Sequence, residues 1–332
     1  MNTRRVQLTG TSTYTISLPK EWAMRQQVGR GSKLSVSESP TGSLVIGKEE
    51  HVRERDAEVG VDAFYGENLR RRLIALYLSG ATKMRFYTYG KEMPASKREM
   101  LLEETRRLIG TEVIEETPSS ITIEYFFSEK DLSIKRAFSR MHLLVGNLLE
   151  DLVKAMAKGD YESAKAVRLR DDEVDRLKFL ILRQINGALL DARIMLAVGL
   201  RSIDAINYAV ATRNLEHIAD EITIAAGYYS ELSGQQALGK SKNDTLVSFG
   251  KSLSGQYKAT IDAFLAGDAE TAQNIIESSK QLESARLDVL AALSKDPTKA
   301  PVQYPLIVDK LCDSVNQYCI EIAEITINMK GE

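Results

Sequence analysis

The chain has 332 residues, 43% of them hydrophobic and 27% charged, and its formal net charge is −2. This composition is typical of a globular protein of two or three domains and argues against a general attraction to nucleic acid or membranes. The sequence shows neither an apolar signal core nor a run of roughly 18 apolar residues that could span a membrane. We therefore expect a cytoplasmic protein in which Cys312 and Cys319 are reduced, buried thiols on one helix.

The first 48 residues are basic and rich in predicted strands. They hold seven basic residues against two acidic ones, a net charge of +5, which leaves about −7 for the rest of the chain. Pro19 is suited to open a short helix that runs to about Gln26, and strands are predicted near residues 6–8, 13–18, 33–37 and 43–46. A segment of this size has a limited core, so we expect it to need a second copy or the next domain.

A mixed α/β domain is predicted for residues 49–130. Leucines at helical spacing predict a helix that ends near Gly80, and a second helix is expected from about Ser96 to Gly110. Strands are expected at residues 84–89, 113–114 and 121–127, which gives an αβαββ order and a small sheet covered by two helices. This domain is a spacer, a second dimer contact or a ligand-binding domain; the sequence does not choose between them.

The remaining residues contain an internal repeat. The sequence GDYESA at 159–164 recurs 108 positions later as GDAETA at 267–272. Each copy lies between long helical patterns, and the predicted helices cover about residues 132–157, 161–188, 200–231, 244–265, 269–293 and 304–329. Such a repeat indicates two related three-helix bundles, at 131–232 and 243–332, joined by a polar linker at 233–244.

Two carboxylate pairs in the first predicted bundle are candidate metal ligands. Asp171 and Asp175 are four residues apart on one helix, and Glu216 and Asp220 are four apart on the next. Both pairs border an apolar stripe, where carboxylates of neighbouring helices can converge, repel one another and call for a cation. The alternative is a solvated acidic face. No Glu-x-x-His pair, phosphate-binding glycine loop, nucleophile elbow or zinc-spaced cluster is present, which argues against a metal hydrolase or oxidase and any other enzyme.

Several motifs then resemble known families. Residues 5–10 (RVQLTG), followed by residues 12–22 (STYTISLPKEW), resemble the SpoVT/AbrB-type swapped-hairpin domain that precedes certain archaeal PhoU-like regulators. Residues 213–220 (RNLEHIAD) are close to the R-N-L-E-R-I-G-D helix signature of PhoU proteins, and residues 171–175 (DDEVD) resemble the other acidic motif of that family. Head and tail together cover roughly three quarters of the chain.

The resemblance implies a fold and several ligands. PhoU proteins regulate phosphate homeostasis, consist of two three-helix bundles and bind multinuclear metal clusters through E/D-x-x-x-D motifs. The implied metal is iron or zinc, with magnesium or manganese as alternatives, and the implied ligands are Asp171, Asp175, Glu216 and Asp220. The AbrB-type head is an intertwined dimer that binds DNA through arginines in well-studied relatives.

Two departures from the family patterns limit what is carried over. The second bundle has Ser279, Glu283, Asp313 and Gln317 at the ligand positions, so a second equivalent metal site is doubtful. The head has Thr15, Ala23 and Met24 where AbrB proteins place arginines. The remaining DNA-binding candidates are Arg4, Arg5, Lys20, Arg25 and Arg30.

The sequence thus predicts a multidomain α+β protein that is mainly α. It would contain a swapped-hairpin β domain at 1–48, a small α/β domain and two tandem PhoU-like three-helix bundles. The predicted function is that of a homodimeric, non-enzymatic regulator of phosphate uptake that binds DNA and metal. The alternative is a regulator that never touches DNA and acts on a phosphate transporter or its signalling partner.

Overall fold

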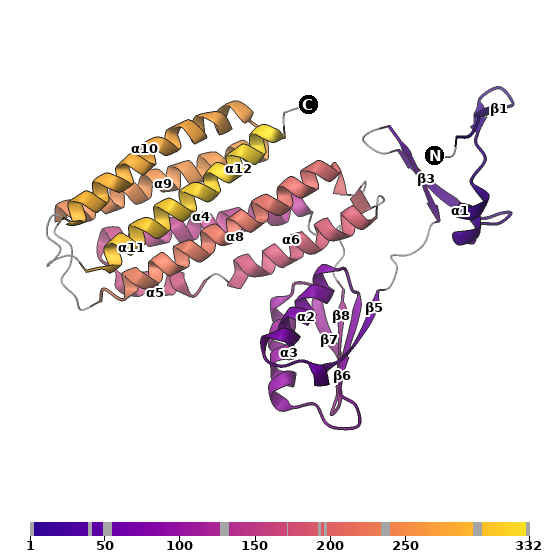
Figure 1. The fold of residues 1–332 in the computed structure, drawn as a ribbon, viewed down its shortest axis with the longest axis horizontal. Helices are drawn as coiled ribbons and strands as arrows, with labels where there is room; N and C mark the ends of the chain where they lie inside the picture. Colours follow the sequence, from indigo (N-terminus) through magenta and orange to yellow (C-terminus); the bar gives the residue numbers. More distant parts are fainter. Residues whose placement is uncertain are drawn as a thin grey trace. The chain divides into compact units, whose positions relative to one another are not determined.

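A computed structural model describes residues 3–38, 42–48, 55–126, 133–170, 172–191, 194–195, 198–233, 240–294 and 301–329. The chain divides into two units, residues 1–53 and 54–332 (Figure 1). The second unit contains an α/β domain and a long helical body. Within the described residues, no helix is long and apolar enough to cross a membrane. The expected fold class, a mainly helical protein with small N-terminal sheets, is confirmed.

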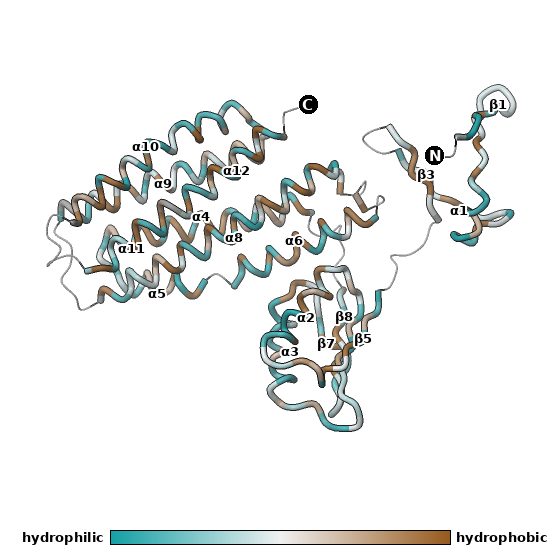
Figure 2. Tube along the Cα trace, viewed as in Figure 1, coloured by the Kyte–Doolittle hydropathy of each residue, from teal (hydrophilic) through white to brown (hydrophobic). Residues whose placement is uncertain are grey.

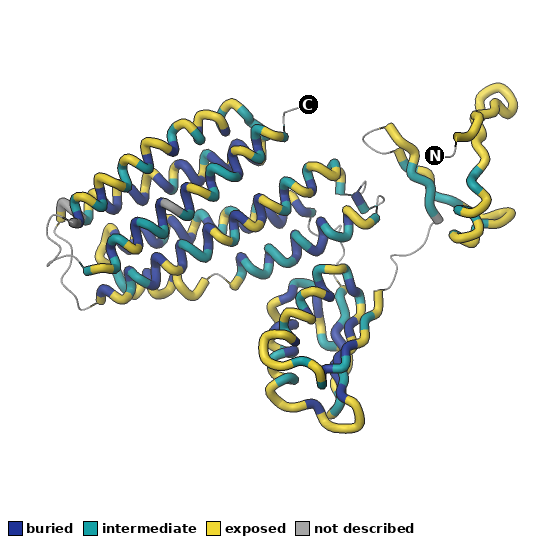
Figure 3. The backbone as a smooth tube through the Cα atoms, in the orientation of Figure 1, coloured by how far each residue is buried: buried dark blue, intermediate teal, exposed yellow. Residues whose placement is uncertain are grey.

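The first unit consists of two antiparallel hairpins and one helix. Strand β1 (Gln7–Thr9) pairs with β2 (Thr13–Thr15) across a turn in which Gly10 has a φ of +69°, and β3 (Leu34–Glu38) pairs with β4 (Leu44–Lys48). Helix α1 (Lys20–Arg25) starts directly after Pro19, as predicted. Strand β2 ends at Thr15, earlier than the expected Leu18. None of the described side chains of this unit is buried, Trp22 included (Figure 3).

The α/β domain has a four-stranded sheet of order β5-β6-β8-β7. Its elements are β5 (Asp56–Gly60), α2 (Glu67–Leu78), β6 (Lys83–Tyr87), α3 (Ala95–Arg107), β7 (Thr111–Thr117) and β8 (Ser120–Tyr125). Strand β5 runs parallel to β6, whereas β8 is antiparallel to both of its neighbours. The predicted αβαββ order was wrong because it lacked β5, an edge strand of sequence DAEVG that buries only Val59. The leucines of α2 and α3 share one core with Met84 and Phe86 of β6.

The helical body is built from two groups of antiparallel helices. The first group contains α4 (Ile134–Lys158), α5 (Tyr161–Arg168), α6 (Asp172–Leu190) and α8 (Ser202–Ser230). The second contains α9 (Lys240–Ala266), α10 (Ala269–Ser294), α11 (Gln303–Asp309), the π-helix η2 (Lys310–Asn316) and α12 (Gln317–Asn328). We call these groups bundle 1 and bundle 2. Apolar and hydrophilic segments alternate along their helices (Figure 2), and one hydrophobic core runs through both bundles.

Two of the predicted long helices were wrong in detail. The helix expected at 161–188 is divided into α5 and α6, and the helix expected at 304–329 contains η2. The repeat itself has a clear structural meaning. Gly159 and Gly267 adopt positive φ at the end of α4 and α9, and Asp160 and Asp268 then accept hydrogen bonds from backbone N–H groups at the start of α5 and α10.

A buried arginine joins bundle 1 to the α/β domain. The side chain of Arg183, on α6, packs against two rings that are nearly perpendicular to each other, with its guanidinium carbon 3.6 Å from the ring centre of Tyr125 and 4.9 Å from that of Tyr77. It also donates a hydrogen bond to the carbonyl oxygen of Tyr77, and Asn186 donates one to the carbonyl of Leu78 at 2.9 Å. The carbonyl groups of the last two residues of α2 thus accept hydrogen bonds from side chains of bundle 1.

Candidate functional site

The predicted metal ligands lie on two neighbouring helices of bundle 1. Asp175 is in the first turn of α6, whereas Glu216 and Asp220 are one turn apart in the middle of α8. Asp171 lies outside the described residues. Glu216 is mostly buried, with a side-chain exposure of 16%, and Asp175 is about half exposed. The apolar stripe of α8, including Leu215, Ile218 and Ala219, faces the core and so brings the acidic edge of α8 beside α6.

A lysine lies between two of the predicted ligands. The ammonium Nζ of Lys178, one turn after Asp175 on α6, is 2.8 Å from Asp175 Oδ1 and 2.6 Å from Glu216 Oε1. It also sits 4.7 Å from the ring centre of Phe179. Burial lowers the pKa of Lys178, but its hydrogen bonds to the two carboxylates outweigh burial and raise the pKa above its ordinary value. The lysine is therefore a protonated, hydrogen-bonded counter-ion for both acids.

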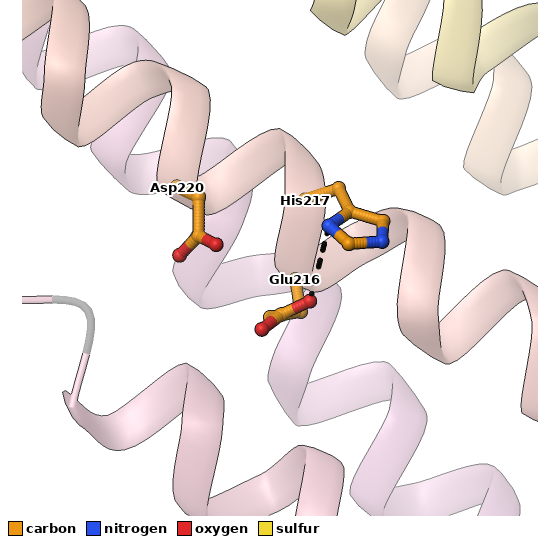
Figure 4. Close-up of side chains that lie close together, drawn as sticks. All are labelled: Glu216, His217 and Asp220. Carbon is orange, nitrogen blue, oxygen red and sulfur yellow. Dashed lines mark ion pairs between the residues drawn. The ribbon is translucent and has the colours of Figure 1, made fainter.

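The other side of Glu216 faces a histidine. Glu216 Oε2 is 3.3 Å from His217 Nδ1, and ligand atoms of Glu216, His217 and Asp220 lie within 4.8 Å of one another (Figure 4). The imidazole of His217 stacks on Tyr318 of α12, with ring centres 5.1 Å apart and planes inclined by 23°. His217 was not among the predicted ligands. Its spacing of three residues from Asp220 was the signal that could have placed both side chains on one helix face.

These contacts show whether the four predicted residues could hold a metal cluster. A multinuclear site needs several carboxylates whose oxygens are available to bridge ions. Here Lys178 occupies one oxygen of Asp175 and one of Glu216, and the second oxygen of Glu216 faces His217. These residues fit a resident ammonium better than a cluster of several ions. Metal binding by the four predicted residues stays a prediction.

The equivalent region of bundle 2 is also occupied by a basic side chain. Arg286 NH2 lies 2.8 Å from Glu283 Oε1, and Arg286 NH1 lies 3.0 Å from Asp309 Oδ1. Ser279 is buried and donates to the carbonyl of Ile276 at 2.6 Å. Among the described side chains at the four compared positions, Glu283 therefore belongs to an acidic cluster, and the side chain of Asp313 lies outside the described residues.

A second charged region borders the α/β domain. A cavity of about 380 Å³ lies between α3 and bundle 1 and contains Arg107, Arg170 and Arg176 in its lining. Each of these arginines has an acidic partner, with N–O distances of 3.5 Å to Asp172, 2.7 Å to Asp151 and 3.1 Å to Glu173, respectively. The cavity is thus lined by ion pairs.

The predicted DNA-binding residues are all exposed in the first unit. Arg4 and Arg5 precede β1, Lys20 and Arg25 are the first and last residues of α1, and Arg30 follows in the next turn. Placement on the surface is what phosphate contacts require.

The β1–β2 hairpin has one apolar face. Leu8 and Tyr14 are directly paired across the strands, and Val6 and Ile16 continue the same alternation. These four side chains are between 52% and 76% exposed. The opposite face is polar, with the hydroxyl oxygens of Thr9 and Thr15 3.2 Å apart. The apolar face has no partner within the described part of this unit.

Comparison with known proteins gives one family and one fold. Residues 138–228, which run from α4 to α8, match the PhoU domain family. The chain resembles the crystal structure of PhoU from Pseudomonas aeruginosa with a TM-score of 0.52 and 20% identity, over 59% of this chain and 94% of that one. It also resembles the phosphate transport system regulatory protein PhoU from Streptococcus pneumoniae, with a TM-score of 0.50 and 20% identity, over 60% of this chain and 94% of that one. A search of curated proteins gives no match.

The family match and the fold agree on the helical body. The matched segment contains all four predicted metal positions as well as Lys178 and His217, whereas bundle 2 lies outside it. Bundle 1 therefore carries a PhoU domain match, and the helical body of this chain is PhoU-like in fold.

Proposed function

We propose that this chain is a non-enzymatic regulator of phosphate uptake. The observation that carries the proposal is the PhoU domain match over bundle 1, within a helical body that shares its fold with two PhoU structures. One of those is described as a regulatory protein of a phosphate transport system. The acidic residues of α6 and α8 are engaged by Lys178 and His217, an arrangement that suits a structural or regulatory role better than catalysis.

The test in cells compares phosphate uptake with and without the protein. Uptake of labelled phosphate at high and low external phosphate is measured in the native host, in a deletion strain and in the complemented strain. We expect the deletion to change the uptake rate and complementation to restore it. Uptake that is identical in all three strains at both phosphate levels would contradict the proposal.

We further propose that two copies associate through the first unit. The apolar face of Val6, Leu8, Tyr14 and Ile16 is a continuous surface on a hairpin that buries none of it. Burying one such side chain is worth roughly 1.5–3 kcal/mol, so a second copy that covered this face would stabilise the unit substantially. The same pairing would double the number of basic side chains available to a duplex.

We propose that the dimer exerts its regulatory effect by binding DNA. A protein that neutralises phosphates releases counterions, so its affinity falls with salt by a slope of about 0.9 per contact on a logarithmic plot. We expect full-length protein to bind duplex DNA with a marked salt dependence. Replacing Arg4, Arg5 and Arg25 by alanine should weaken binding and flatten that slope, as measured by fluorescence anisotropy between low and physiological salt.

The matched control removes three exposed basic residues of bundle 1 instead: Arg136, Lys158 and Lys165. It loses the same charge but should keep the slope of the unchanged protein. An absence of binding at physiological ionic strength, or an equal effect of both triple variants, would favour the alternative function. In that case the protein acts on a phosphate transporter or its signalling partner without DNA.

A further inference from the structure

We infer that both bundles hold their acidic clusters together with resident basic side chains, Lys178 in bundle 1 and Arg286 in bundle 2, in place of metal ions. The first observation is the position of the Lys178 ammonium. It joins α6 to α8 by hydrogen bonds of 2.8 Å to Asp175 and 2.6 Å to Glu216. With only 14% of its side chain exposed, the lysine lies inside the cluster and not over it.

The second observation is that the same arrangement recurs in bundle 2. The sequence repeat has a period of 108 residues, and this period relates Asp175 to Glu283 and Lys178 to Arg286. In each bundle the basic residue lies three positions after the acid on its own helix and reaches a second acid on the following helix. The side chain of Arg286 is 19% exposed, close to the value for Lys178.

The hydrogen bonds of Arg286 show how a side chain takes the place of a metal ion between two carboxylates. Its guanidinium donates from Nε and NH2 to the carboxylate of Glu283 and from NH1 to Asp309. This fork satisfies two carboxylates at once, and a guanidinium does not lose its proton in proteins. A metal ion at the same carboxylates would have to displace a group with a fixed positive charge and several hydrogen bonds.

A carboxylate on another side of α8 also has a resident cation. Lys310, at the start of η2, lies 2.9 Å from Glu221, so Glu216 and Glu221 each have a lysine partner from a different helix. Two carboxylates within a few ångströms repel each other unless a positive charge lies between them. Lysine and arginine supply that charge here, so the helical body is expected to keep its packing when metals are removed.

The experiment measures metal content and thermal stability of the full chain. Protein is purified without chelator, incubated with iron, zinc or manganese, desalted and examined by elemental analysis. Unfolding is followed by circular dichroism with and without EDTA. We expect substoichiometric metal and an unchanged Tm in EDTA. Stoichiometric metal that survives desalting, together with a lower Tm in EDTA, would overturn the inference.

Variants separate the role of the lysine from a general loss of charge. Lys178→Met retains much of the side-chain volume but leaves Asp175 and Glu216 without their ammonium, so we expect Tm to fall by roughly 5 °C. Added manganese or zinc should restore part of this loss by occupying the vacated position. The control Lys154→Met removes a lysine whose side chain is 61% exposed and should change neither Tm nor the response to metal.

A double variant keeps the test decisive if Lys178→Met folds poorly. Adding Glu216→Gln removes one of the two repelling charges, so the double variant should regain stability relative to Lys178→Met and lose the rescue by metal. Equal Tm values for Lys178→Met and Lys154→Met would contradict the inference. All of these measurements use purified protein, so they can fail or succeed independently of the proposed role in phosphate uptake.

Discussion

Replacement of Arg183 by methionine is expected to lower the free energy of unfolding by about 3 kcal/mol. The side chain of Arg183 is 6% exposed, and its guanidinium packs against the rings of Tyr77 and Tyr125. Methionine retains an apolar stem but loses both cation–π contacts and the hydrogen bond to the carbonyl of Tyr77. That carbonyl would then be left without its charged donor at the junction of two domains.

Urea unfolding of the purified chain and hydrogen exchange of β8 and the end of α2 measure this effect. We expect faster exchange in these two segments and a lower midpoint of unfolding. Arg136→Met is the matched control, because it removes the same charge from an exposed position on the first turn of α4. If both variants unfold at the same urea concentration, Arg183 does not stabilise the contact between bundle 1 and the α/β domain.

Replacement of Leu8 by aspartate is expected to turn the proposed dimer into a monomer. Leu8 lies at the centre of the apolar hairpin face, directly opposite Tyr14. A carboxylate there removes the gain from burying leucine and adds the cost of burying a charge, together at least 3 kcal/mol, or more than about a hundredfold in the dimer Kd. DNA affinity should fall with it, since a monomer presents half of the basic residues.

Light scattering and analytical ultracentrifugation over a range of protein concentrations report the change. The control Ser12→Asp adds the same charge at the exposed turn beside the hairpin and should leave the dimer intact. A monomeric unchanged protein would refute association through this face. So would a Leu8→Asp variant that remains a dimer.

The sequence located most of the helices but not every strand. Apolar residues at helical spacing located α2, α4 and α8 because each buries a continuous stripe. Strand β5 was missed because DAEVG has only one buried side chain and no alternation, so its place in the sheet comes from backbone pairing with β6. Pairing across the sheet leaves no periodic signal in a short edge strand.

The candidate site was predictable only in part. The acidic residues of α6 and α8 could be found from their spacing. Spacing within one helix does not show which side chains of a second helix will contact them. Lys178 is visibly three residues after Asp175, yet its contact with Glu216 depends on how α6 packs on α8. The same applies to Tyr318 of α12, which stacks on His217 from the other bundle.

Asp309 shows a different limit of the prediction. Comparison with bundle 1 selected Asp313 as the acid of the last helix; the side chain of Asp313 lies outside the described residues, and among those described Arg286 contacts Asp309, four residues earlier. The comparison assumed a continuous α-helix, but η2 starts directly after Asp309 and includes position 313. A π-helix accommodates an extra residue per turn and so changes the relation between sequence position and helix face.

The π-helix therefore changes which side chains face the core before and after it in the continuous helix of α11, η2 and α12. In an α-helix each residue turns the chain by about 100°, so one additional residue rotates everything after it by that amount. Helix η2 absorbs this rotation, and so Asp309 can point toward α10 while Cys319 and Ile322 of α12 still face the core. Deleting a single residue from η2 would therefore restore regular α-helical winding, and Asp309 and the apolar face of α12 would keep their directions.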